Sequence, residues 1–263
     1  MNIVKRELRA NLKSTVIWFL AIAFIVGSGM MKFDSFSKNL QGIDILETMP
    51  ESFTNSFAMA GLDLTKVQDM VAAMMFYIYL ILGLHGLLLG NNIISKEERD
   101  KTSSFLYGLP RTRRQILWSK TIAGSFIVMG INILTFVVFY FMTKNHAQEI
   151  AHRNYLLHLA LVVFFIQMIY YTLGILMASV IKSYKLSSNI SLSLFILSFI
   201  IATLMNMVDQ VDFLKIITPF QYFDAKEIWE QGGIDGKYIF LSMMIIAVQI
   251  LLSFLFYPKR DLQ

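Results

Sequence analysis

The residues best suited to specific chemistry in this chain lie in one segment, Ser95–Lys120, between two long apolar runs. In order, the segment holds an acidic pair, an apolar pair, a proline and a group of arginines: Glu97, Glu98, Phe105, Leu106, Pro110, Arg111, Arg113 and Arg114. Charged side chains orient a partner, and an aromatic–aliphatic pair supplies contact energy when it is buried at an interface. The pattern predicts a docking surface for another protein.

Motifs of common catalytic and nucleotide-binding sites do not occur in the sequence. There is no G-x-x-x-x-G-K-[ST], no H-E-x-x-H and no G-x-S-x-G. His146, Glu149 and His152 are three residues apart, but on a helix they would spread over about 240°, which makes a poor set of metal ligands. The chain also has no cysteine, so disulfides and thiol chemistry are excluded. We expect no catalytic residue, metal or cofactor in this chain.

The segment must be positioned by membrane helices, because the composition is that of a membrane protein. Apolar residues make up 56% of the 263 residues, and the mean hydropathy is +0.58. About 20 apolar residues of helix cross a bilayer core. Six uncharged runs approach or exceed that length and predict a polytopic all-α membrane protein, a single domain over 1–263, with spans at 15–31, 70–94, 121–142, 155–181, 186–207 and 238–257.

The distribution of charge predicts which side of the membrane each connection occupies. The termini and the connections 95–120 and 182–185 hold fifteen Lys/Arg and five Asp/Glu, whereas the other connections hold eight and thirteen. Positive residues stay in the cytoplasm during insertion. We therefore expect both termini and Ser95–Lys120 to be cytoplasmic in a plasma-membrane protein. The net charge of +5 then indicates contact with membrane lipid rather than nucleic acid.

The two ends of the bundle carry shorter predicted elements. In residues 1–14, Val4, Leu8 and Leu12 recur at helical spacing between basic residues, which is typical of an interfacial helix. Such a helix could be a membrane anchor or a partner contact. On the exoplasmic side, 32–69 favours short helices, and 208–237 is too apolar for a free loop and too charged for a span. The latter segment predicts a re-entrant region or short helices over the bundle.

Four polar side chains inside the spans are candidates for a translocation path: His85, Asn132, Gln167 and Gln249. Ionisable groups within a membrane are functional candidates. Hydrogen bonding between helices explains all four equally well, and we prefer it for the amides. In the same span as His85, Gly86 and Gly90 form a G-x-x-x-G, which permits close helix packing. Packing within one subunit is favoured over a dimer contact.

The segment Ser95–Lys120, which we call the polar connection, resembles the signature of ABC-2 type transporter permeases. In that family the signature has the form E-x-x-x-G-T…L-L…P-x-[ST]-R…G-K after the second span. The matching residues begin with Glu97 and end with Lys120, and include Thr102, Phe105, Leu106, Pro110 and Arg113. Two glycines of the signature are replaced, by Lys101 and Ser119. The basic Arg6–Arg9 start, the six spans and the Thr218–Phe223 element before the last span extend the resemblance along the chain.

The resemblance implies a fold and a set of partners. It implies a cytoplasmic coupling helix over about Thr102–Tyr107 that presents Phe105 and Leu106 to a P-loop ATPase, with ion pairs from Glu97, Glu98 and Arg113. ATP and magnesium would be bound by that ATPase. Two permeases, as identical copies or paralogues, would assemble with two ATPase chains. Within the family, permeases of this size resemble bacterial exporters of antimicrobial peptides and phenol-soluble modulins.

We therefore expect the membrane subunit of an ATP-driven exporter of an amphipathic or hydrophobic peptide, toxin or drug. Two alternatives remain open from the sequence. One is an ion- or proton-coupled carrier that uses His85, and the other is a sensor or immunity subunit that does not transport.

Overall fold

The described residues of the computed structural model are 3–39, 50–56, 59, 61–101, 111–146, 149–207 and 215–259. Within these ranges every regular element is helical. Six helices are long and apolar enough to cross a membrane; they are α1 (Ile3–Asn39), α4 (Val67–Arg99), α6 (Arg113–Thr143), α7 (Glu149–Val180), α8 (Tyr184–Met205) and α10 (Gly236–Phe256). The short ones are α3 (Glu51–Ser56), η2 (Pro219–Gln221), α9 (Ala225–Gln231) and η3 (Tyr257–Lys259). The predicted all-α membrane fold is confirmed.

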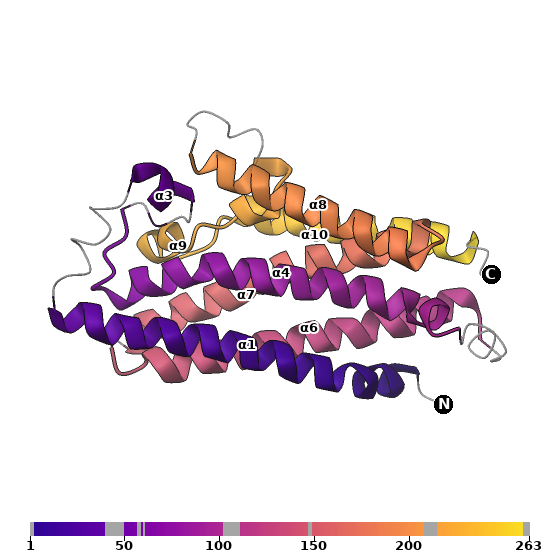
Figure 1. Ribbon diagram of the computed structural model, residues 1–263, viewed down its shortest axis with the longest axis horizontal. Helices are drawn as coiled ribbons and strands as arrows, with labels where there is room; N and C mark the ends of the chain where they lie inside the picture. The colour runs from indigo at the N-terminus through magenta and orange to yellow at the C-terminus, as the bar shows by residue number, and fades with distance from the viewer. Residues whose placement is uncertain are drawn as a thin grey trace.

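The centre of the bundle is the pair α4 and α7, flanked by α1 and α6 on one side and by α8 and α10 on the other (Figure 1). The apolar windows of α4 and α7 are 61% and 72% buried, against 17% for α8 and 11% for α10. Most side chains on these outer helices face away from the protein and suit contact with lipid. Both termini lie at one end of the bundle, and α3 and α9 lie at the other (Figure 1).

Glycine allows α4 and α7 to approach closely. A β-carbon on Gly86 would lie 2.5 Å from the Gln167 carbonyl oxygen, and one on Gly90 would lie 2.0 Å from that of Tyr171. Gly174 of α7 is equally close to the α4 backbone. Small residues permit this approach, and dispersion contacts then hold the helices together in lipid. The G-x-x-x-G pattern is therefore used for packing within the subunit.

The helices extend beyond the predicted spans because polar residues at their ends continue the hydrogen-bonding pattern. Thr112 and Gln115 form a capping box that starts α6 eight residues before the predicted third span. At the start of the described chain, α1 runs without a break from Ile3, so residues 3–14 continue into the first span. The stripe that α1 buries there is Ile3, Glu7 and Asn11, whereas Leu12 is exposed. Val4 and Leu8 of the apolar pattern are half-buried beside this stripe.

At the opposite end, part of the predicted re-entrant region forms η2 and α9. Asp224 caps α9 by accepting hydrogen bonds from the backbone of Lys226 and Glu227. Helix α9 packs on α4 and α7, and Trp229 contacts Tyr155 of α7 edge to face at 5.3 Å. These residues cover the end of the bundle, as the alternative of short helices predicts. Residues 208–214 lie outside the described ranges.

Candidate functional site: a buried charge network

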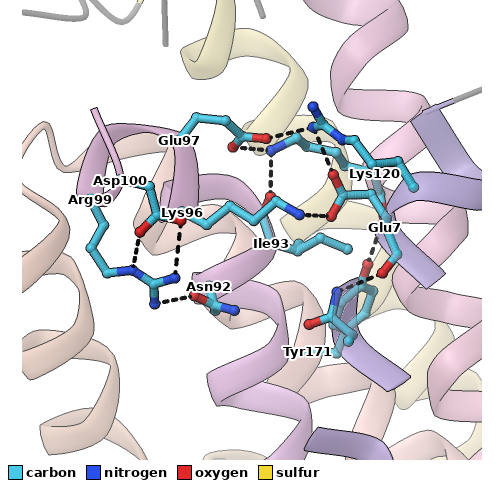
Figure 2. Close-up of polar contacts among 11 residues, drawn as sticks. Glu7, Asn92, Ile93, Lys96, Glu97, Arg99, Asp100, Lys120 and Tyr171 are labelled. Atoms are coloured by element: carbon cyan, nitrogen blue, oxygen red, sulfur yellow. Dashed lines mark hydrogen bonds and ion pairs between the residues drawn. The ribbon is translucent and has the colours of Figure 1, made fainter. Parts of the chain in front are cut away.

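A network of buried and half-buried charges joins three helices at the end of the bundle that holds the termini, which we call the basic end. Its members are Arg6 and Glu7 of α1, Lys96 and Glu97 of α4, and Lys120 of α6 (Figure 2). The side chains of Glu7 and Lys120 are fully buried. Three cations and two anions leave the network with a formal charge of +1.

The contacts run continuously from α1 to α6. Arg6 Nη2 donates to Glu7 Oε1 at 3.0 Å and to Glu97 Oε1 at 2.9 Å. Lys96 Nζ contacts the other oxygen of Glu7, and Lys120 Nζ contacts the other oxygen of Glu97. Each carboxylate therefore bridges two cations. Buried charges persist in proteins when they are paired and hydrogen-bonded in this way.

Backbone groups and neighbouring side chains hold the network in place. Lys120 Nζ also donates to the Ile93 carbonyl oxygen at 2.6 Å. Tyr171 of α7 donates its hydroxyl to the Thr121 carbonyl oxygen at 2.9 Å, next to Lys120. On α1, Asn11 donates to the Glu7 carbonyl oxygen at 2.9 Å. The bond from Lys120 joins α6 to α4, that from Tyr171 joins α7 to α6, and that from Asn11 lies within α1.

The ion pair between Glu97 and Lys120 holds together the two residues that flank the segment 98–119. Glu97 lies near the end of α4 and Lys120 near the start of α6, and the segment 98–119 runs between them. Sequence reasoning assigned Glu97 an ion pair with a partner protein, but the structure places its carboxylate inside the bundle, 6% exposed. We call this ion pair, with its link to α1 through Arg6, the clamp.

The other residues predicted for docking divide into two groups. Glu98 is half-buried on the last turn of α4. Arg113 donates to the Pro258 carbonyl oxygen at 3.1 Å, which ties the start of α6 to the chain after α10. Thr102, Phe105, Leu106 and Pro110, with the expected coupling helix, lie outside the described residues.

Lys101 takes a backbone conformation that suits glycine. Its φ of 55° lies in the left-handed region, directly after Asp100 ends α4. Glycine is the usual residue at such a helix end because it has no β-carbon to clash. The signature quoted from the sequence has glycine at this position, so the structure supplies its physical reason.

The candidate translocation residues hydrogen-bond one another in the interior. Asn132 of α6 donates to Gln167 Oε1 of α7, and Gln167 Nε2 lies 2.7 Å from His85 Nδ1 of α4. The amide of Gln167 and the ring of His85 therefore share a hydrogen bond, whose donor depends on the histidine tautomer. Gln249 lies elsewhere and accepts from Thr172. The structure thus brings three of the four residues together.

The comparisons with known proteins agree with this architecture. A family model described as ABC-2 family transporter protein matches residues 1–262. The chain belongs to the ABC-2 transporter family. No match was found among curated proteins. As an ABC-2 permease, the protein is a multi-pass membrane subunit of an ABC transporter and works with a separate ATPase subunit.

Sequence reasoning missed the partners of the network. Glu7 is the only acid in the first fourteen residues, which was a signal for an internal ion pair. Lys120 adjoins an apolar run and was matched to the signature without a role. Since the partners are separated by 89 and 23 positions, sequence spacing could not pair them.

Proposed function

We propose that this permease is the membrane subunit of an ATP-driven exporter, with its basic end in the cytoplasm and the segment 98–119 as its contact with the ATPase. The observation that carries the proposal is the clamp. In a chain of this family, it joins both ends of that segment to α1, α4 and α6.

The clamp suits the transmission of force because it is buried and multiply bonded. A displacement of the segment 98–119 by a partner would reach the ends of α4 and α6 together, since Glu97 and Lys120 are in contact. Arg6 would extend the displacement to α1. Packed elements of this kind move as units. ATP binding and hydrolysis in the partner would thereby shift the helices.

We propose that two copies assemble with two ATPase chains, and that the cargo is an amphipathic or hydrophobic peptide, toxin or drug. The weakly buried outer helices leave apolar surface that a second copy could cover in part. The cargo class comes from the resemblance to bacterial peptide exporters. Stimulation of ATP hydrolysis by amphipathic helical peptides in proteoliposomes would support it, and indifference to a broad peptide panel would contradict it.

The contact with the ATPase is tested by single charged substitutions in the connection. Phe105→Asp and Leu106→Asp are expected to abolish co-purification with the partner P-loop ATPase, because a carboxylate cannot be buried unpaired at an interface. Ile150→Asp is the matched control, since Ile150 is 69% exposed at the opposite end of the bundle. Undiminished recovery of the ATPase with both connection variants would refute the assignment.

A further inference from the structure

A polar groove lies between α1 and α8 near the basic end, with α4 as its floor. Its volume is about 310 Å³. The lining residues used below are Trp18 of α1, and His85, Leu88, Asn92, Ser95 and Arg99 of α4. Among the described lining residues there are hydroxyls, amides and a guanidinium but no carboxylate. The groove therefore presents hydrogen-bond donors and positive charge to an occupant.

Polarity changes along the groove in one direction. The α4 residues on its floor recur at helical spacing, so they form one stripe that leads from the membrane interior to the basic end. Leu88 and Trp18 line the inner part, where Trp18 packs edge to face on His85 at 5.4 Å. Asn92, Ser95 and Arg99 follow toward the end of α4. This gradient matches a molecule with an apolar part and a polar head.

Ser95 has an unused hydrogen-bonding group at the polar part of this groove. The residue is 3% exposed, and its Oγ has no hydrogen-bond partner within the described chain. A buried hydroxyl without a partner is unfavourable. The Oγ itself is enclosed by the protein, so a change of the Ser95 rotamer toward the groove would be needed to offer this hydroxyl to an acceptor there.

Arg99 supplies a cation that can be redirected into the groove. It donates from Nη1 to Asn92 at 2.8 Å and from Nε to Asp100 at 2.9 Å. The Arg99 hydrogen bond lowers the pKa of Asp100, but that carboxylate is exposed, and ion pairs in water are weak and exchangeable. A guanidinium has five N–H donors, so Arg99 retains donors for a second anion.

We propose that this groove binds the anionic, phosphate-type headgroup of an amphiphile from the cytoplasmic leaflet. Arg99 and Ser95 donate to the headgroup, and the tail remains in lipid beyond Trp18. Basic pockets between membrane helices on the cytoplasmic side are suited to lipid headgroups. This proposal rests on the proposed function only for the assignment of the groove to the cytoplasmic leaflet. Binding of the amphiphile itself can be measured without the ATPase or transport.

Trp18 provides a direct probe of occupancy. The chain has three tryptophans, so Trp118→Phe and Trp229→Phe leave Trp18 as the only one. This full-length protein in detergent micelles is titrated with phosphatidylglycerol or phosphatidylcholine whose acyl chains are brominated. We expect saturable quenching of Trp18 fluorescence by phosphatidylglycerol at severalfold lower concentration than by phosphatidylcholine. Equal quenching curves would overturn the proposal.

Variants in the same background test the two donors. Loss of a charge-assisted hydrogen bond in Arg99→Gln should weaken binding of phosphatidylglycerol about tenfold, and Ser95→Ala should weaken it by a smaller factor. Asp100→Asn should tighten binding because it releases Arg99. Arg153→Gln, at an exposed position on the opposite end, should leave the curve unchanged. Binding unaffected by Arg99→Gln and Ser95→Ala together, in monodisperse protein, would overturn the proposal.

Competition identifies the source of the headgroup. Glycerol 3-phosphate is added to the lipid-saturated protein. Failure to relieve quenching at millimolar concentration supports an amphiphile, because the tail then contributes to binding. Relief at that concentration would overturn the lipid assignment in favour of a soluble phosphate compound.

Discussion

Glu97, like Glu7, is paired with two cations, and through Lys120 it also links the end of α4 to the start of α6. Its loss would leave Arg6, Lys96 and Lys120 with Glu7 as the remaining anion in the network. Loss of Lys120 would be milder, since Glu97 would keep Arg6. The network thus has an internal order of importance that follows from charge balance.

Glu97→Gln is expected to lower the free energy of unfolding by about 3–5 kcal/mol, the cost of leaving a buried charge unpaired. Adding Lys120→Met should restore part of that loss, because it removes the cation left without a partner. Unfolding in mixed micelles with increasing dodecyl sulfate measures both effects. Lys237→Met, at an exposed position at the start of α10, is the control. Additive losses in the double variant would contradict the pairing of Glu97 with Lys120.

The sequence predicts which residue types matter at this site but not how they pair. Glu97 was singled out as a charged contact, and Lys120 was matched to the signature. Whether a carboxylate near a helix end faces a partner or the bundle depends on the rotation of the helix, which the packing of α1 and α6 determines. The polar inward stripe of Glu7 and Asn11 was missed for the same reason, since hydrophobic periodicity favours apolar stripes.

At the scale of elements, the existence and order of the six long helices follow from hydropathy because a bilayer demands long apolar runs. Their ends do not follow, since capping residues such as Thr112 extend a helix past its apolar part. Gly86 and Gly90 are a partial sequence signal for the close packing of α4. The α7 residues that contact these glycines can be identified only from the fold.

Close packing of α4 on α7 predicts that Gly90 tolerates no side chain. Gly90→Ala should destabilise the protein by about 1–3 kcal/mol, the usual cost of overpacking, because the new β-carbon would overlap the Tyr171 carbonyl oxygen. Thermal unfolding in detergent measures the loss. Gly130→Ala is the matched control, since a β-carbon on Gly130 has no neighbouring atom within 4 Å. Equal effects of the two substitutions would argue against this helix contact.

At the end of α4 we expect a substitution that introduces glycine to raise the free energy of unfolding. Lys101→Gly should stabilise the protein by up to about 1 kcal/mol, because a β-carbon is unfavourable in the left-handed region. Lys101→Ala keeps the β-carbon and should bring no such gain. The same unfolding measurement compares them. Stabilisation by alanine as large as that by glycine would show that loss of the lysine charge, not backbone strain, is responsible.

At the scale of the whole molecule, the two ends of the bundle differ in charge as the sequence predicts. The ends of α1, α4, α6 and α10 that meet at the basic end carry the Lys/Arg excess, and α3 and α9 mark the opposite end (Figure 1). An even number of spans places both termini on one side, and we expect this side to be cytoplasmic because it carries the excess of basic residues. The direction of transport depends on this orientation.

The absence of cysteine from the sequence makes the orientation directly measurable. Single cysteines are introduced at exposed positions: Lys13, Lys182 and Lys259 on the basic side, and Lys66, Arg153 and Lys237 on the other. In intact cells a membrane-impermeant maleimide should label only the second set, and permeabilised cells should label both. The cysteine-free protein, treated in the same way, should not be labelled and is the control for specificity. Labelling of the first set in intact cells would reverse the topology, and the segment 98–119 could then not reach a cytoplasmic ATPase.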